Sequence, residues 1–128
     1  MGTLVVFLVW LSGHYKVNKQ GIFMYQKGCQ FHIGQVVTHS LFGYKGAIYD
    51  VDAEFMLTDE WYKKVAKSSP PKDQPWYHIL VDGVEHSTYV AERNLKAVLD
   101  PTPIDHPLIN EYFEEFNGIS YNSLSKKN

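Results

Sequence analysis

The alternation of apolar and polar residues predicts short β-strands through the central part of the chain. Gly34–His39 alternates weakly and is rich in β-branched residues, which favour a strand. Lys45–Asp52 predicts a second strand, and the glycines between the two permit the tight bend that joins them. The alternation of the second strand places Ala47, Tyr49 and Val51 on one face.

A hairpin gives the clearest local pattern, with two apolar runs separated by Asp82-Gly83. This dipeptide is typical of a two-residue type I′ turn, which would pair Trp76 with Tyr89 across the strands. One face of the hairpin is predicted to join the core. The other face carries Trp76, His78 and Tyr89, so we expect it either to be covered by other segments or to bind a partner.

Two helices are predicted outside the strands. Thr58 or Asp59 can cap a short helix, which two consecutive prolines further on prevent from continuing, leaving a lid-like connection. In the tail, apolar residues recur at helical spacing between Asp105, which can cap a helix, and Gly118, which can end one. Beyond Gly118 the chain is expected to fray.

These elements predict a mainly β fold, namely a small SH3-like, partly open antiparallel barrel with one short inserted helix and a C-terminal helix. The predicted organisation is an extension over residues 1–30, a β domain over 31–100, a helical extension over 101–121 and a frayed tail over 122–128. No repeat or low-complexity tract interrupts it.

The N-terminal extension is open to three interpretations. Thr3–Leu11 is strongly apolar but far shorter than the roughly 20 residues of a membrane-spanning helix. No Lys or Arg precedes it, as a signal peptide would require. Met24 opens a segment typical of a natural start, so we interpret the extension as a leader from an upstream start. An extra element packed on the domain and a membrane anchor are the alternatives.

Composition and charge limit the function classes. The 128 residues suit one domain, and a net charge of -2 gives no bulk attraction to nucleic acid or an anionic membrane. Between Phe31 and Asp100, ten acidic residues oppose seven basic ones, and Arg93 is the single arginine of the chain. The lone Cys29 excludes an intramolecular disulfide, which fits a reducing cytosol and equally a disulfide-free secreted protein.

Motifs for catalysis or ligand binding are lacking in the sequence. The glycines around Tyr44-Lys45 precede a strand rather than a helix, which excludes a phosphate-binding loop. Asp50 and Asp52 share a strand face, as two metal ligands might, but no third ligand recurs nearby, so we interpret them as a solvated strand end. The histidines lack zinc-site spacing, and no nucleophile motif occurs. We therefore expect no enzymatic activity, metal or cofactor.

A local basic strip is the one feature that favours nucleic acid. It consists of Lys63, Lys64, Lys67 and Lys72, on the predicted helix and the loop after it. Clustered lysines can contact phosphates, so the strip is a candidate DNA-binding surface. An ordinary solvated helix face is the alternative, and the charge balance favours that interpretation.

Three segments together resemble the HspQ family, also called the YccV-like or hemimethylated-DNA-binding domain family. They are "FHIGQVVTHSLFGYKGAIYDVDAEF", "DQPWYHILVDGVEHSTYVAERNL" and "HPLINEYFEEFNG", and the resemblance covers about Phe31 to Tyr121. It implies a small antiparallel β domain that is cytoplasmic, self-associating, stress-related and without enzymatic activity.

The resemblance also implies two kinds of partner. One function is engagement of the Lon protease, as specificity enhancer and as substrate, and the other is binding to hemimethylated DNA with an effect on replication initiation. The acidic balance favours the protease adaptor. Trp76, His78 and Tyr89 are the candidate docking face, because aromatic residues are enriched at the centres of interfaces. Burial beneath the terminal helix or another subunit is the alternative for that face.

Overall fold

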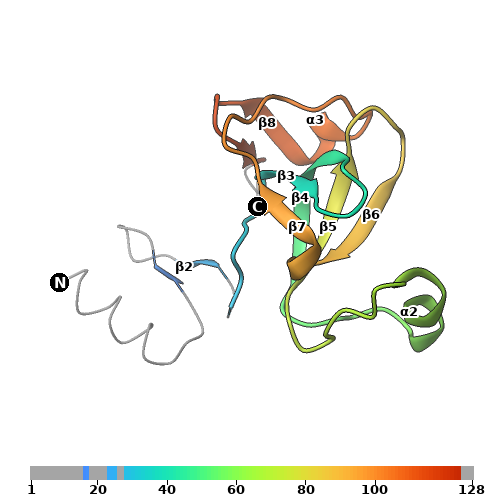
Figure 1. Cartoon of the computed structure of the whole chain (residues 1–128). Coiled ribbons are helices and arrows are strands. Elements are labelled where there is room, and N and C mark those ends of the chain that lie inside the picture. The colour runs from blue at the N-terminus through green and yellow to red at the C-terminus, as the bar shows by residue number, and fades with distance from the viewer. Residues whose placement is uncertain (1–15, 18–22, 26–27, 125–128) are drawn as a thin grey trace.

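The computed structural model of the chain describes residues 16–17, 23–25 and 28–124. Its centre is a five-stranded antiparallel sheet of order β6-β5-β4-β3-β7 (Figure 1). Two antiparallel pairs, β1 with β2 and β8 with β9, accompany the sheet. The elements are β1 Lys16–Val17, β2 Phe23–Tyr25, β3 Val36–His39, β4 Lys45–Asp52, α2 Asp59–Val65, β5 Trp76–Val81, β6 Ser87–Ala91, the 3₁₀ helix η1 Glu92–Asn94, β7 Leu95–Ala97, α3 Ile109–Tyr112, β8 Phe113–Phe116 and β9 Tyr121–Ser123.

The sheet bends strongly because its two edges are consecutive in the chain. Strands β3 to β6 follow one another as a meander, and the three residues of η1 then lead directly to β7, which pairs with β3 at the opposite edge. So short a connection brings both edges of the sheet close together. Among the described strands β6 and β7 do not pair, so the barrel is open. The prediction of a small, mainly β, partly open fold is confirmed.

The two faces of the sheet carry separate hydrophobic clusters. The inner cluster lies inside the bend, and the outer cluster packs beneath the C-terminal segment. The inner cluster consists of Phe31, Val37, Ile48, Tyr77, Ile79, Val90 and Leu95, with Val51 against it. The outer cluster consists of Val36, Ala47, Leu80, Ile104, Phe113 and Tyr121, with Tyr49, Val98, Ile109 and Phe116 against it.

The β5–β6 hairpin has a longer loop than the sequence predicts. Tyr89 pairs with His78 and not with Trp76, and Val81 N donates to His86 O across the loop at 3.4 Å. The predicted register is therefore wrong by two residues. A shift of two residues leaves the side chains of β5 and β6 on their predicted faces, because side chains alternate with a period of two. Val84 and His86, which the predicted register placed on the core face, instead lie in the loop and are exposed.

Contacts from outside the hairpin explain the longer loop. Gly83 N donates to Asp105 O at 2.8 Å, and Asp105 N donates to Asp82 Oδ1 at 2.6 Å. Gly83 has a φ of 84°, whereas Asp82 is not among the residues with positive φ, so the turn is not type I′. The C-terminal segment selects a loop conformation that the local sequence alone does not.

The predicted C-terminal helix is correct only for its first turn. Helix α3 has four residues, and the chain then forms the β8–β9 hairpin instead of continuing to Gly118. Extended backbone buries both Phe113 and Tyr121 against the outer face of the sheet. The expected fraying is wrong as far as Leu124, whose N–H donates to Tyr112 O at 3.1 Å. Residues 125–128 lie outside the described residues.

The fold begins before the predicted boundary at Phe31. Cys29 is buried, and Gln30 N donates at 2.8 Å to Glu92 Oε2. The buried Tyr77 hydroxyl donates to the same oxygen at 2.6 Å, so the start of the domain is fastened to η1. Thr3–Leu11 lies outside the described residues and its interpretation stays a prediction. None of the helices in the described part of the chain is long and apolar enough to cross a membrane.

Candidate functional site

A long excursion between β4 and β5, which we call the arm (residues 53–75), carries α2. As predicted, Thr58 caps the helix, and its Oγ1 accepts from Trp61 N at 3.1 Å. The Tyr62 hydroxyl donates to Pro70 O at 2.5 Å, which closes the arm on itself. Figure 1 places the arm at the opposite end of the molecule from β8 and α3. The arm is therefore a separate cover over a different part of the sheet.

Aromatic rings join the arm to the outer face of the sheet. Trp76 is 1% exposed, and its ring centroid lies 4.9 Å from that of Phe55 and 5.2 Å from that of Tyr89. Its Nε1–H donates to Pro71 O at 3.0 Å. The Trp61 ring contacts both Trp76 and Tyr89. Trp76, a residue of the predicted docking face, thus supports the arm from beneath and is not itself on the surface.

A groove of about 750 Å³ lies between the arm, the β3–β4 turn and strand β6. Its walls include apolar side chains that are largely open to solvent, and the most exposed of them is Phe42, at 74%. His78 and Tyr89, the other two residues of the predicted docking face, are half-buried and line it. The apolar lining includes Leu41, Phe42, Leu57, Trp61 and Val65.

The groove runs along the open edge of the sheet. All five residues of β6 line it, and β6 pairs only with β5 among the described strands. The bond from Val81 N to His86 O, and the bond from Glu92 N to Pro75 O, fix which residues of β6 face β5. By that alternation the N–H and C=O groups of Ser87, Tyr89 and Ala91 point away from β5. Those of Ser87 and Tyr89 offer a template for another extended chain, whereas Ala91 is buried.

The predicted basic strip is divided by the structure. Lys63, Lys64 and Lys67 are exposed on and just after α2. Lys72 instead forms an ion pair with Asp59 at 2.9 Å and lies over the Tyr62 ring, 4.5 Å from its centroid. The hydrogen bond from Lys72 lowers the pKa of the Asp59 carboxyl. Three lysines therefore remain available to an anionic partner.

A buried histidine positions the apolar turn at the far side of the groove. His39 Nδ1 accepts from the N–H groups of both Leu41 and Phe42, each at 3.1 Å. The His39 ring also stacks on that of Phe42, at 4.6 Å between centroids. Burial lowers the pKa of His39, in agreement with a neutral ring that accepts at Nδ1. The turn depends on this protonation state.

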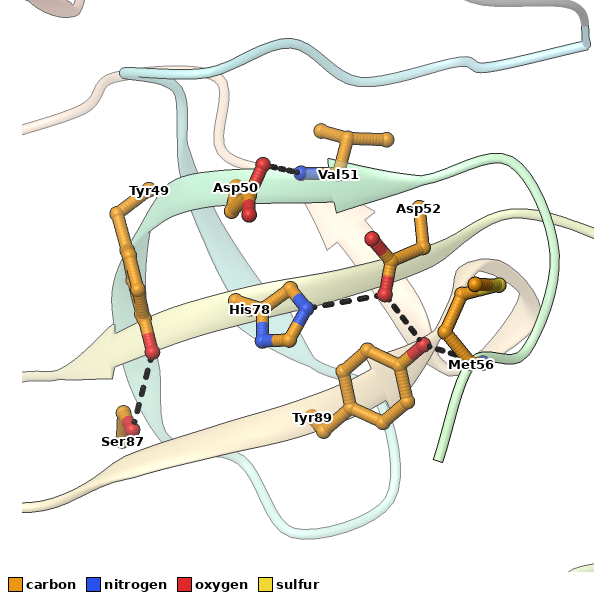
Figure 2. Close-up of polar contacts among 8 residues, drawn as sticks. All are labelled: Tyr49, Asp50, Val51, Asp52, Met56, His78, Ser87 and Tyr89. Carbon is orange, nitrogen blue, oxygen red and sulfur yellow. Dashed lines mark hydrogen bonds and ion pairs between the residues drawn. The ribbon is translucent and has the colours of Figure 1, made fainter. Parts of the chain in front are cut away.

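A polar cluster lies beside the groove, where β4, β5 and β6 meet (Figure 2). His78 Nε2 lies 3.1 Å from Asp52 Oδ2, and the Tyr89 hydroxyl donates to the same oxygen at 2.7 Å. Met56 N donates to the Tyr89 hydroxyl at 3.0 Å and links the arm to the cluster. Burial, and then the hydrogen bond to Asp52, raise the pKa of Tyr89.

A β-bulge brings a third metal-type ligand to the two aspartates. Ile48 pairs with Ile79, yet Asp50 pairs with His78, so Tyr49 is the extra residue. Without the bulge, Asp50 would point into the core, since it would share the face of Ile48. The predicted face was wrong for Val51 for the same reason, because Val51 packs on the inner cluster.

Sequence reasoning missed this cluster because His78 lies on a different strand. Asp50, Asp52 and His78 each offer one ligand atom, and these atoms all lie within 4.8 Å of one another. The separation in sequence hides a contact that strand pairing creates. The sequence did place His78 on one predicted face of the hairpin. Which residues of β4 lie beside that face can be deduced only once the pairing register of β4 and β5 is known.

Comparison with known proteins gives the family. The profile described as "Hemimethylated DNA-binding protein YccV like" matches residues 29–120. F-box only protein 21 of Mus musculus is 36% identical over 93 residues, and that of Homo sapiens is 34% identical over 93 residues. Each match covers 71% of this chain but only 15% of the relative, so the shared region is one part of a much longer protein there. The fold, the matched residues and the sequence motifs agree, and the chain belongs to the YccV-like (HspQ) family.

Proposed function

We propose that this protein is a non-enzymatic binding module that captures an extended segment of a partner protein in the groove along β6. In this role it acts as an adaptor that engages a Lon-type protease, as specificity enhancer and as substrate. The Lon-type partner comes from the family resemblance, and the groove supplies a surface of the right chemistry. Self-association and a cytoplasmic location belong to the same proposal.

The observation that carries the proposal is the combination of an open strand edge with exposed apolar walls. Outward-facing N–H and C=O groups along β6 can pair with an extended peptide, which supplies affinity independent of sequence. Pockets on both sides of the edge can then select alternate side chains of that peptide. Phe42 and Val65, from opposite walls, are the exposed anchors for apolar side chains.

Charge favours a peptide over a nucleic-acid backbone in this groove. Lys67 is its one lysine or arginine, and the remaining lining is largely apolar. Phosphate contacts require several clustered cations, whereas a peptide requires hydrogen bonds and apolar contact. A peptide with apolar residues and an acidic residue near Lys67 matches the lining best.

The test is Lon-dependent degradation of a purified substrate protein, measured with and without this chain. Ser87→Pro removes a backbone N–H that points away from β5, so no hydrogen bond between β5 and β6 is lost and the fold should persist. Because a peptide paired with β6 would need this N–H, the variant should no longer stimulate degradation. Ser87→Ala keeps the N–H and is the matched control, expected to stimulate like the wild type. Full stimulation by a folded Ser87→Pro variant would reject strand addition at β6.

A second candidate function is binding to hemimethylated DNA, which the family description and the three exposed lysines favour. Fluorescence anisotropy against unmethylated, hemimethylated and fully methylated duplexes tests it. Selective binding to the hemimethylated duplex that is lost when Lys63, Lys64 and Lys67 are replaced by Glu would establish this function. Weak binding, equal for all three duplexes, would leave the adaptor function alone.

A further inference from the structure

We propose that Asp50, Asp52 and His78 form a binding site for a divalent first-row transition-metal ion such as Zn²⁺. The site goes beyond the proposed function, because strand addition at β6 requires no ion. It lies on β4 and β5, where the bulge at Tyr49 turns the aspartates outward (Figure 2). β-Bulges commonly re-aim side chains beside functional sites.

The geometry brings the donors close to the spacing that an ion requires. Two ligands bonded to one Zn²⁺ at about 2.0–2.2 Å lie roughly 3–3.5 Å apart. His78 Nε2 already lies 3.1 Å from Asp52 Oδ2, and an Asp50 oxygen lies within 4.8 Å of both. Asp50 is exposed on the strand, so a change of rotamer can close the remaining distance.

The electrostatics favour a cation at this position. Among residues 28–124, neither Asp50 nor Asp52 forms an ion pair with Lys or Arg, and the one ion-pair partner of Asp52 is His78. Asp52 is half-buried, with 21% of its side chain exposed, which weakens solvent screening of its charge.

The donor set indicates which class of ion would bind. An imidazole nitrogen with two carboxylates suits Zn²⁺ and its neighbours, whereas Mg²⁺ and Ca²⁺ prefer oxygen ligands alone. The Tyr89 hydroxyl, which donates to Asp52 at 2.7 Å, would hold that ligand in place from outside the coordination shell. Three protein ligands leave at least one coordination position to water, as in other open zinc sites.

Isothermal titration calorimetry with ZnCl₂ tests the proposal on the full chain after EDTA treatment and dialysis. We expect one ion per chain at this site, and at least tenfold weaker binding in Asp50→Asn and in His78→Gln. His86→Gln is the matched control, since His86 is exposed and outside the cluster, and it should bind like the wild type. MgCl₂ should give no comparable binding.

Two further readouts keep the test independent of folding and of the other histidines. Asp50→Asn is isosteric at an exposed position, so its circular dichroism and Tm without metal should match the wild type. Zn²⁺ should raise the Tm of the wild type and of His86→Gln but leave that of Asp50→Asn unchanged. Absence of Zn²⁺ binding, or wild-type affinity in both Asp50→Asn and His78→Gln, would overturn the proposal.

Discussion

Two segments cover the outer face of the same sheet, and they cover it differently. The C-terminal segment is joined through backbone groups, since Tyr121 N donates to Gly34 O and Gly83 N donates to Asp105 O, each at 2.8 Å. The arm is joined mainly through side chains, by rings around Trp76 and by the Tyr89 hydroxyl, which accepts a hydrogen bond from Met56 N. The C-terminal segment excludes solvent from the outer cluster, whereas the arm leaves a groove beside the sheet.

The difference shows where a small domain places its binding surface. Backbone contact at close range permits dense packing, as around Phe113 and Tyr121. The arm contacts the sheet through a few large rings, so apolar side chains elsewhere on the arm, such as Val65, stay exposed along the groove. The closed end therefore contributes stability, and the open end contributes the candidate site.

The largest effect is expected where the closed cover is broken. In Gly34→Ala the new Cβ would lie 2.0 Å from Tyr121 O, at a φ of 93°. Because the backbone at residue 34 and that at Tyr121 are both fixed by the surrounding structure, we expect the free energy of unfolding to fall by more than about 4 kcal/mol. Urea unfolding of the variant and the wild type measures this difference.

Gly43→Ala provides the matched control for that change. Gly43 also has positive φ, at 79°, but its added Cβ would have no atom within 4 Å. It should lose only about 1 kcal/mol. Equal losses in the two variants would show that backbone conformation, rather than close approach, governs the closed cover.

A smaller effect is expected where the arm is loosened. Trp76→Phe removes the Nε1–H bond to Pro71 O and part of the ring contact with Phe55. We expect a loss of about 1–2 kcal/mol, with faster amide hydrogen exchange in the arm and little change near Phe113. Equal acceleration in both regions would mean that the two covers open together.

The pH should act on the groove through His39. Because burial lowers its pKa, His39 contributes stability that is present above its unfolded pKa of about 6.5 and is lost as pH falls through the folded value. From pH 7 to pH 5 the wild type should therefore lose more stability than His39→Gln, which cannot titrate there. Identical pH profiles in urea unfolding would contradict this assignment.

The smallest effect on stability is expected at the open wall. Phe42→Ser changes a side chain that is 74% exposed, so unfolding free energy should stay within about 0.5 kcal/mol of the wild type. Stimulation of Lon-dependent degradation should nevertheless drop at least fivefold, because an apolar wall of the groove is lost. Unaltered stimulation would remove Phe42 from the proposed site.

The sequence alone determined the elements whose pattern is local. Strand β4 matches the predicted Lys45–Asp52, Thr58 caps α2, and the faces of the β5–β6 hairpin are as predicted. Periodicity and capping depend on neighbouring residues, so they can be recognised without the fold. The family motifs likewise identified the YccV-like family, which the profile match confirms.

Tertiary structure alone decided the features that depend on distant residues. The apolar spacing after Asp105 fits a helix as well as strand β8, and burial of Phe113 beside Tyr121 selected the strand. The bulge at Tyr49 belongs to strand pairing, and it alone brings Asp50 to His78. From the sequence alone, Trp76 could lie either on a binding surface or in the core. Only the packing of the arm placed it inside, because burial depends on which segment comes to lie on top.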